Sequence, residues 1–179
     1  MKKIGKFIGA SIIAVIFLSG MSGVTACELN SELIAGQDTS VGNIHVLHSG
    51  SCDRYMTITY ETYGEWDLTE THLAVATSFS DIPQTNANKP NKPHNPKIGK
   101  FEYSDPHSAV KSYKYTIDLA KYITPTSDGR YIGELYVAAH AVVEHPCLGE
   151  ETAWGDTYGI PFNPSGKGSW ALYFIVELY

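Results

Sequence analysis

The chain has 179 residues, of which 43% are hydrophobic and 12% aromatic, which is enough apolar sequence for one domain with a buried core. Only 18% of the residues are charged, and 16 glycines and 9 prolines are spread along the sequence. This composition excludes a coiled coil, and it excludes intrinsic disorder for most of the chain. The formal net charge is −6, and Arg54 and Arg130 are the only arginines, which indicates that nucleic acid is not a partner.

Residues 1–26 have the features of an export signal peptide. Three lysines precede an apolar run over residues 8–18, which is shorter than the roughly 20 residues of a membrane-spanning helix. Val24-Thr25-Ala26-Cys27 resembles a prokaryotic lipobox, in which the cysteine is lipidated and becomes the new N-terminus. The resemblance implies that Cys27 anchors the mature protein to the extracytoplasmic face of a membrane. The alternative is ordinary signal cleavage followed by secretion.

The three cysteines are Cys27, Cys52 and Cys147. In an oxidising compartment an odd number leaves one thiol without a partner. If Cys27 carries lipid, Cys52 and Cys147 remain as a pair. Cys52 comes just before one predicted strand and Cys147 just after another, and antiparallel neighbours would bring such positions together. We therefore expect a disulfide between them, with a stabilising effect of about 4–5 kcal/mol.

Residues 27–42 are polar and show no strong period, so they are predicted to form a tether, and the folded domain is predicted over 43–179. Alternation with a period of two predicts strands at 43–48, 54–63, 69–77, 110–119, 130–144 and 170–178. The segment 130–144 is apolar on both faces, so it is predicted to be a central strand covered on both sides. Glu177 interrupts the positions that would face lipid in an outer-membrane barrel, which disfavours that architecture.

The predicted fold is all-β, an antiparallel β-sandwich of about six to eight strands, because short strands alternate with Gly-, Pro- and Asn-containing loops. One of these loops, residues 81–99, contains four prolines among asparagines and lysines. Neither a strand nor a helix persists through such a sequence, so a long surface loop is expected there. Because rigid sandwiches often carry function on loops, this loop is a candidate recognition surface.

Residues 150–156 place Glu150, Glu151 and Asp156 around Trp154 in a segment predicted to be a loop. Carboxylates of this kind could hold Ca²⁺. A tryptophan face beside acids could also stack on a sugar ring while the acids bind its hydroxyls. The structural alternative is that Trp154 closes the end of the sandwich.

A second Trp–acid combination occurs at Trp66 and Asp67. If these residues lie at the same end of the sandwich as Trp154, the two tryptophans would form the rim of one binding site. The alternative is that each tryptophan anchors a separate part of the core.

The histidines give a weaker indication of chemistry. His140, Glu144 and His145 are similar to the zinc motif H-x-x-E-H, but the spacing differs by one residue, and in a strand His145 would face away from the other two. His72 could add a third ligand, although hydrogen-bonded structural histidines are the favoured interpretation. The sequence contains no phosphate-binding glycine loop, nucleophile elbow or C-x-x-C pair, so no catalytic residue is predicted.

Four stretches of the sequence together resemble a pattern that recurs in secreted bacterial and archaeal surface proteins. They are Thr69-Glu70-Thr71-His72-Leu73, Ile82-Pro83-Gln84-Thr85, Ala138-Ala139-His140-Ala141-Val142-Val143 and Glu151-Thr152-Ala153-Trp154-Gly155. In those proteins the pattern occurs in all-β modules. The resemblance implies an extracellular module and transfers no catalytic residue to this chain.

We therefore expect an envelope lipoprotein or secreted β-sandwich module with a non-enzymatic role in surface structure, adhesion or ligand capture. The expected partners are a membrane, through the lipid on Cys27, and a glycan or an envelope protein. One alternative is a small extracellular hydrolase or carbohydrate-active enzyme that uses Glu150, Glu151 or Asp156 with a histidine. Another is a structural module stabilised by Ca²⁺.

Overall fold

The computed structural model describes residues 26–88, 94–166 and 168–179, so the predicted signal peptide lies outside the described residues except for Ala26. The strands are β1 Cys27–Ala35, β2 Thr39–His48, β3 Tyr55–Thr62, β4 Asp67–Ala76, β5 Tyr103–Val110, β6 Ser112–Asp118, β7 Gly133–His145, β8 Gly149–Asp156, β9 Ile160–Pro161 and β10 Leu172–Leu178. Short 3₁₀ turns lie at Phe79–Asp81, Ile98–Lys100 and Leu119–Lys121. Across these described ranges, no helix has the length and apolar character needed to cross a membrane.

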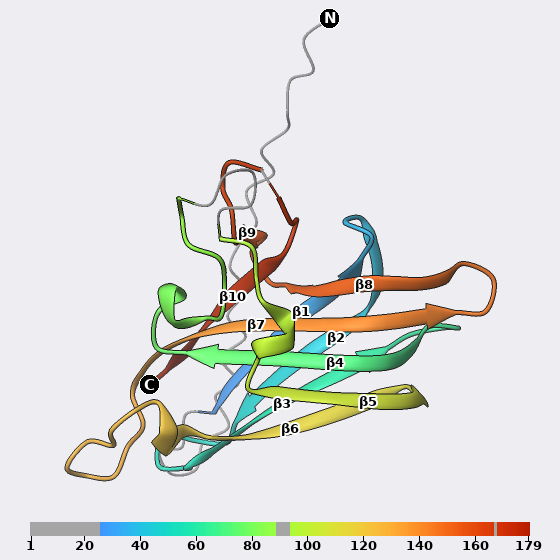
Figure 1. Cartoon of the computed structure of the whole chain (residues 1–179). Helices are drawn as coiled ribbons and strands as arrows, with labels where there is room; N and C mark the ends of the chain where they lie inside the picture. Colours follow the sequence, from blue (N-terminus) through green and yellow to red (C-terminus); the bar gives the residue numbers. More distant parts are fainter. Residues whose placement is uncertain (1–25, 89–93, 167) are drawn as a thin grey trace, which may run out of the picture.

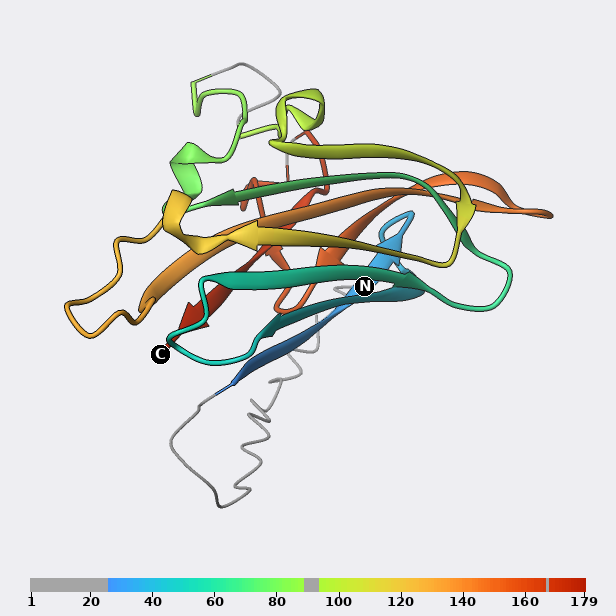
Figure 2. The ribbon, with the colours of Figure 1, turned by 90° about the horizontal axis from the view of Figure 1, so that it is seen from below.

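The strands form one antiparallel series in the order β5-β4-β7-β8-β1-β2-β3-β6, and β10 joins it by pairing with β7. This series curves into a nearly closed sheet whose two halves face each other across the core (Figures 1 and 2). The predicted all-β antiparallel fold is confirmed. The segment 81–99 is also confirmed as a surface loop where it is described, because only short turns and one isolated bridge occur there.

Strand β7 occupies the centre of this arrangement, as its two-sided apolar pattern predicts. Along one edge it pairs with β4, and along the other it pairs with β8 and β10. Its inward side chains are fully buried in the interior core. Its outward Ala138 and His140 are buried as well, because turns and loops cover that face of the sheet.

Two apolar clusters therefore stabilise the fold. The inner cluster fills the space between the two halves of the sheet and includes Leu33, Ile44, Tyr60, Leu73 and Val137. The outer cluster lies on the other face of β4, β7 and β8 and comprises Ala74, Ala76, Ile82, Phe101, Ala138, Trp154, Phe162 and Ala171. Most of its covering residues come from the segments that connect β4 to β5 and β8 to β10.

Side chains join the two outermost strands, β5 and β6, which do not pair with each other. The Tyr113 hydroxyl donates a hydrogen bond of 2.9 Å to Asp105 Oδ2, and the Tyr113 ring contacts His107 at 4.2 Å between centroids. Tyr115 packs against Tyr103 and exchanges a hydrogen bond with Thr71 of β4. Aromatic packing and side-chain hydrogen bonds thus hold this edge where backbone pairing ends.

The prediction of a tether over residues 27–42 is wrong. This segment forms β1 and the beginning of β2, and β1 lies between β2 and β8. Its polar residues Glu28, Asn30 and Glu32 alternate with inward-facing positions, and Leu33 is fully buried. The sequence hides the alternation of apolar and polar residues, because the inward position 31 is the small polar residue Ser31, which is also fully buried.

The predicted disulfide between Cys52 and Cys147 is also wrong, because both side chains are exposed free thiols. Cys52 precedes β3, and Cys147 follows β7. These strands are not neighbours, because β8, β1 and β2 lie between them in the sheet. Four successive antiparallel pairings give β3 and β7 the same direction. The start of one strand and the end of the other are therefore at opposite ends of the sheet. Cys27 is also free and half-buried.

Gly42 allows β2 to approach β3 closely. A Cβ atom at this position would lie 1.9 Å from the carbonyl oxygen of Glu61, which is a backbone atom that cannot move aside. We expect Gly42→Ala to lower the free energy of unfolding by more than about 2 kcal/mol, because overpacking at a backbone contact forces the strands apart. Urea unfolding measures the change. Gly99→Ala is the matched control, since no atom lies within 4 Å of its added Cβ. Equal stability of the two variants would contradict this packing.

Candidate functional site

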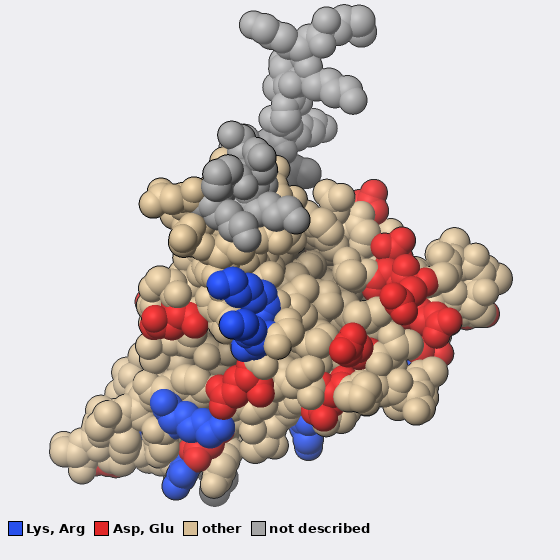
Figure 3. Space-filling view, in the orientation of Figure 1, with Lys and Arg blue, Asp and Glu red and all other residues tan. Residues whose placement is uncertain are grey.

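A hollow of about 420 Å³ lies at the end of the sheet formed by the β3–β4 turn and the end of β7, and Glu65, Asp67, Lys111, Glu144 and Pro146 line it. We call it the acidic pocket. Glu65, Lys111 and Pro146 come from three separate connections in the chain, and Asp67 and Glu144 come from the adjoining ends of β4 and β7. Figure 3 shows Asp and Glu atoms crowded on the side of the molecule where the β7–β8 hairpin lies, whereas most Lys and Arg atoms are on the other half.

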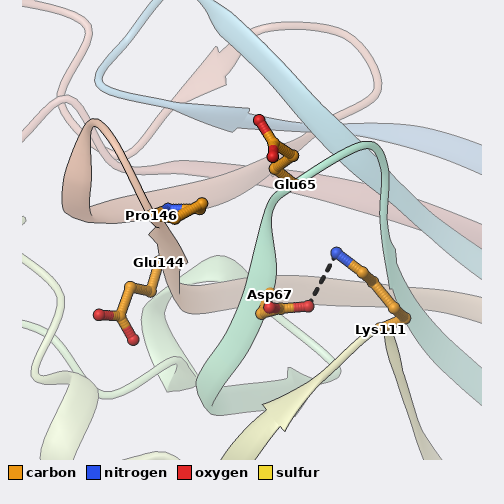
Figure 4. Close-up of a pocket in the computed structure, with 5 residues that line it drawn as sticks. All are labelled: Glu65, Asp67, Lys111, Glu144 and Pro146. Carbon is orange, nitrogen blue, oxygen red and sulfur yellow. Dashed lines mark ion pairs between the residues drawn. The ribbon is translucent and has the colours of Figure 1, made fainter.

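Lys111 holds the β3–β4 turn in place from the short connection between β5 and β6. Its Nζ donates hydrogen bonds to the carbonyl oxygens of Gly64 at 2.9 Å and Trp66 at 2.6 Å, and it pairs with Asp67 Oδ1 at 2.8 Å. Figure 4 shows Lys111 reaching toward Asp67, with the carboxylates of Glu65 and Glu144 directed away from that pair. The ammonium group is therefore already occupied by three acceptors from the protein.

The other two acids have free capacity to accept hydrogen bonds. Glu65 makes one long contact, 3.6 Å from its Oε2 to His145 Nε2. Among the described residues, the Glu144 carboxylate has no hydrogen bond or ion pair. An ionised carboxylate offers about four acceptor positions. The pocket can thus receive hydroxyl or amino donors from a ligand.

The sheet register places two of the predicted site residues beside Glu144. Asp67 of β4 lies opposite Glu144 of β7, which in turn lies opposite Glu150 of β8. Residues directly opposite each other in antiparallel strands share a face, so these three acids form one row across the outer surface. The sequence predicts Asp67 and Glu150 as site residues but not their partners. The register aligns Glu144 with them, and the β3–β4 turn and the β5–β6 connection bring Glu65 and Lys111 close.

The two tryptophans do not form one rim. Trp66 is half-buried beside the pocket, where its ring packs on His145 at 5.0 Å and against the inner cluster. Trp154 is only 2% exposed and belongs to the outer cluster, in contact with His140, Phe101 and Phe162. The sugar-stacking role considered for Trp154 is therefore wrong, and the residue packs inside the protein instead.

The segment 150–156 is a strand and not the predicted loop. Glu150 and Glu151 are exposed, and Asp156 Oδ1 accepts a hydrogen bond from the backbone N–H of Gly159. At about 3.3 Å per residue, Glu150 and Asp156 lie roughly 20 Å apart and cannot bind one ion. Within the described ranges, no group of three or more His, Cys, Asp or Glu side chains is placed to hold a metal ion.

A row of histidines crosses the outer face at mid-sheet. Ser104, His72, His140 and Trp154 are successive cross-strand partners on β5, β4, β7 and β8. The Ser104 hydroxyl lies 3.0 Å from His72 Nδ1, and His72 Nε2 lies 3.2 Å from Glu70 Oε1. Both ring nitrogens of His72 are thus in contact with a side-chain oxygen, one from Ser104 and one from Glu70.

His140 is the unusual member of this row. It is 3% exposed, and neither ring nitrogen has a hydrogen-bond partner among the described residues. Its ring packs against His72 at 5.3 Å and Trp154 at 4.7 Å. Burial, and secondarily the neighbouring His72, lowers the pKa of His140 to about 3, so the imidazole is neutral at pH 7.

This burial predicts that the fold loses stability in mild acid. Between about pH 6.5 and pH 3 the unfolded chain binds a proton at His140 that the folded chain excludes, so the free energy of unfolding falls as the pH is lowered. At about 1.4 kcal/mol per pH unit, this group makes the protein about 2 kcal/mol less stable at pH 5 than at pH 7. Urea unfolding should show that His140→Leu removes this loss and that His45→Gln, at an exposed histidine, retains it. An unchanged acid loss in His140→Leu would refute the assignment.

The four stretches that resemble secreted surface modules meet around the outer cluster. Their residues His72, Ile82, Ala138 and Trp154 all lie on the same covered face of the sheet. A comparison of the chain with protein-family models, curated proteins and solved structures finds no match. The acidic pocket and the histidine row are therefore the features from which a function can be inferred.

Proposed function

We propose that this protein is an exported, membrane-anchored binding module that captures a ligand in the acidic pocket. One observation carries the proposal: carboxylates from the β3–β4 turn and β7 line one hollow, and Glu65 and Glu144 retain free acceptor positions there. The predicted export signal of residues 1–26 and the lipobox resemblance of residues 24–27 support the anchor. No part of the proposed role requires catalysis.

The charges of the pocket favour a ligand that donates hydrogen bonds. Asp67 and the backbone carbonyls occupy Lys111, so no positive group is left to attract an anion. The remaining carboxylates favour hydroxyl or amino groups, and Pro146 contributes an apolar wall. Glycans, including amino sugars, combine these features and are the ligand class that we favour.

A glycan array probed with the folded domain tests this function. We expect Glu144→Gln to weaken binding of a captured glycan by about 10- to 100-fold, because a charge-assisted hydrogen bond contributes about 1.5–3 kcal/mol. The melting temperature should stay the same, since the Glu144 side chain is exposed. Glu151→Gln is the matched control, because it removes an exposed acid from β8 that does not line the pocket. Equal binding by both variants, or no bound glycan, would contradict the proposal.

One observation favours a second function, the hydrolysis of small acyl esters. Ser104, which is exposed, the buried His72 and the half-buried Glu70 form a hydrogen-bonded series in the order nucleophile, base and acid. In such a reaction Ser104 Oγ attacks the acyl carbon while its proton passes to His72 Nδ1. The proton then leaves with the alcohol, and water hydrolyses the acyl-serine. The loop carboxylates considered from the sequence take no part in this arrangement.

A fluorophosphonate probe distinguishes this second function from simple binding. If the series activates Ser104, the probe should modify the protein covalently, and mass spectrometry should locate the adduct on Ser104. Ser104→Ala should abolish labelling, and His72→Gln should slow it at least about tenfold, because the base is lost. Ser112→Ala, in the neighbouring strand β6, is the control. The absence of any adduct on Ser104 would exclude this function and leave the binding role intact.

A further inference from the structure

Cys27 is attached to the folded domain without any spacer. It is the first residue of β1, and its Cα lies opposite His48 of β2. Its side chain is half-buried and packs against the inner cluster, and burial together with the nearby Glu177 raises the pKa of the thiol. A lipid on this cysteine would therefore emerge directly from the end of the sheet.

The end of the molecule around Cys27 is formed by several distant parts of the chain. Figures 1 and 2 both place the start of β1, the β2–β3 connection, the long connection before β7 and the C-terminus on the same side. The pairing agrees, since Tyr55 lies opposite Asp118 and Leu178 lies opposite Gly133. The acidic pocket and the β7–β8 hairpin are at the other end.

Four of the seven large apolar side chains that are exposed in the described ranges lie at this end. Tyr179 is 60% exposed, Tyr55 50%, Leu47 45% and Ile132 40%. With Cys27 they define what we call the anchor end. Tyrosines and aliphatic side chains of this kind are enriched where proteins meet the headgroup layer of a membrane.

The basic residues of the anchor end are paired with acids. Arg54 binds Asp118 and lies over the Tyr55 ring at 5.7 Å, and Arg130 binds Asp128. These are the only arginines in the chain. Because their charges are already compensated, contact with a bilayer at this end depends on apolar side chains and the lipid, and little on anionic headgroups.

We propose that the lipidated protein stands end-on on the bilayer, with the anchor end in the headgroup layer and the acidic pocket held away from it. The inference rests on the proposed lipidation of Cys27. A lipid joined to the sheet without a spacer keeps this end near the bilayer, and the exposed apolar side chains around Cys27 insert it into the headgroup layer. Strand β7, 13 residues long, spans most of the distance between the two ends, roughly 40 Å.

The two exposed cysteines serve as native probes for this orientation. Cys52 lies in the β2–β3 connection at the anchor end, and Cys147 lies in the β7–β8 hairpin at the opposite end. The full-length chain is expressed in a bacterial host that processes it, and the mature protein is purified in two forms, Cys147→Ser and Cys52→Ser. Each form is labelled on its remaining exposed cysteine with a fluorophore and reconstituted into phosphatidylcholine vesicles that carry a headgroup quencher.

We expect the fluorophore on Cys52 to lose most of its emission and the one on Cys147 to lose none. Adding the pair Leu47→Ser and Tyr55→Ser should restore emission at Cys52, whereas Leu148→Ser, at the opposite end, should not. Equal quenching at both cysteines, or the same quenching with and without the anchor-end substitutions, would overturn the end-on orientation.

Mass spectrometry of the same preparations separates this inference from the proposed anchor. A diacylglyceryl adduct on Cys27 together with equal quenching at both probes refutes the orientation alone. A mature protein whose Cys27 carries no lipid refutes the anchor and the orientation together. Neither result affects the glycan-binding test, which uses the folded domain in solution.

Discussion

Strand β7 is paired along both edges and covered on both faces, and the remainder of the fold depends on this burial. Its inward side chains complete the inner cluster, and its outward side chains support the outer one. A strand buried on both faces must be apolar at nearly every position, and β7 meets this requirement from Leu135 to Val143 apart from His140. The exception is informative. Among the described residues of β7, His140 is the one whose buried side-chain polar atoms have no hydrogen-bond partner.

The same strand sets the distance between the two ends of the molecule. Cys27, Tyr55 and Tyr179 lie at the end where β7 begins, and the acidic pocket lies where it ends. An antiparallel sheet collects its turns at these two ends, so residues from distant parts of the chain meet there. The proposed function uses both ends: one faces the membrane, and the other presents carboxylates to a ligand.

The candidate site was only partly predictable. The sequence predicts Asp67 and Glu150 as ligand-binding residues because Asp67 follows Trp66 and Glu150 comes four residues before Trp154. The tryptophans themselves are not the ligand-binding element. Trp154 fills the outer cluster, and Trp66 packs on His145. No sequence pattern assigns Glu144 and Lys111 to this pocket, because their place in it depends on the register between β4, β7 and β8 and on the turn between β5 and β6.

Periodicity alone determined the all-β fold, the central position of β7 and the long loop after β4, because alternation, two-sided apolarity and clustered prolines are local properties of the chain. The tertiary structure decided the rest. The segment at β1 and the segment at β8 became strands because neighbours on both sides pair with them, and Gly155 lets Phe174, Ile44 and Ala139 approach β8 closely. Strand direction separated Cys52 from Cys147, and register created the acidic row. Direction and register arise from pairing between distant segments, which no local pattern encodes.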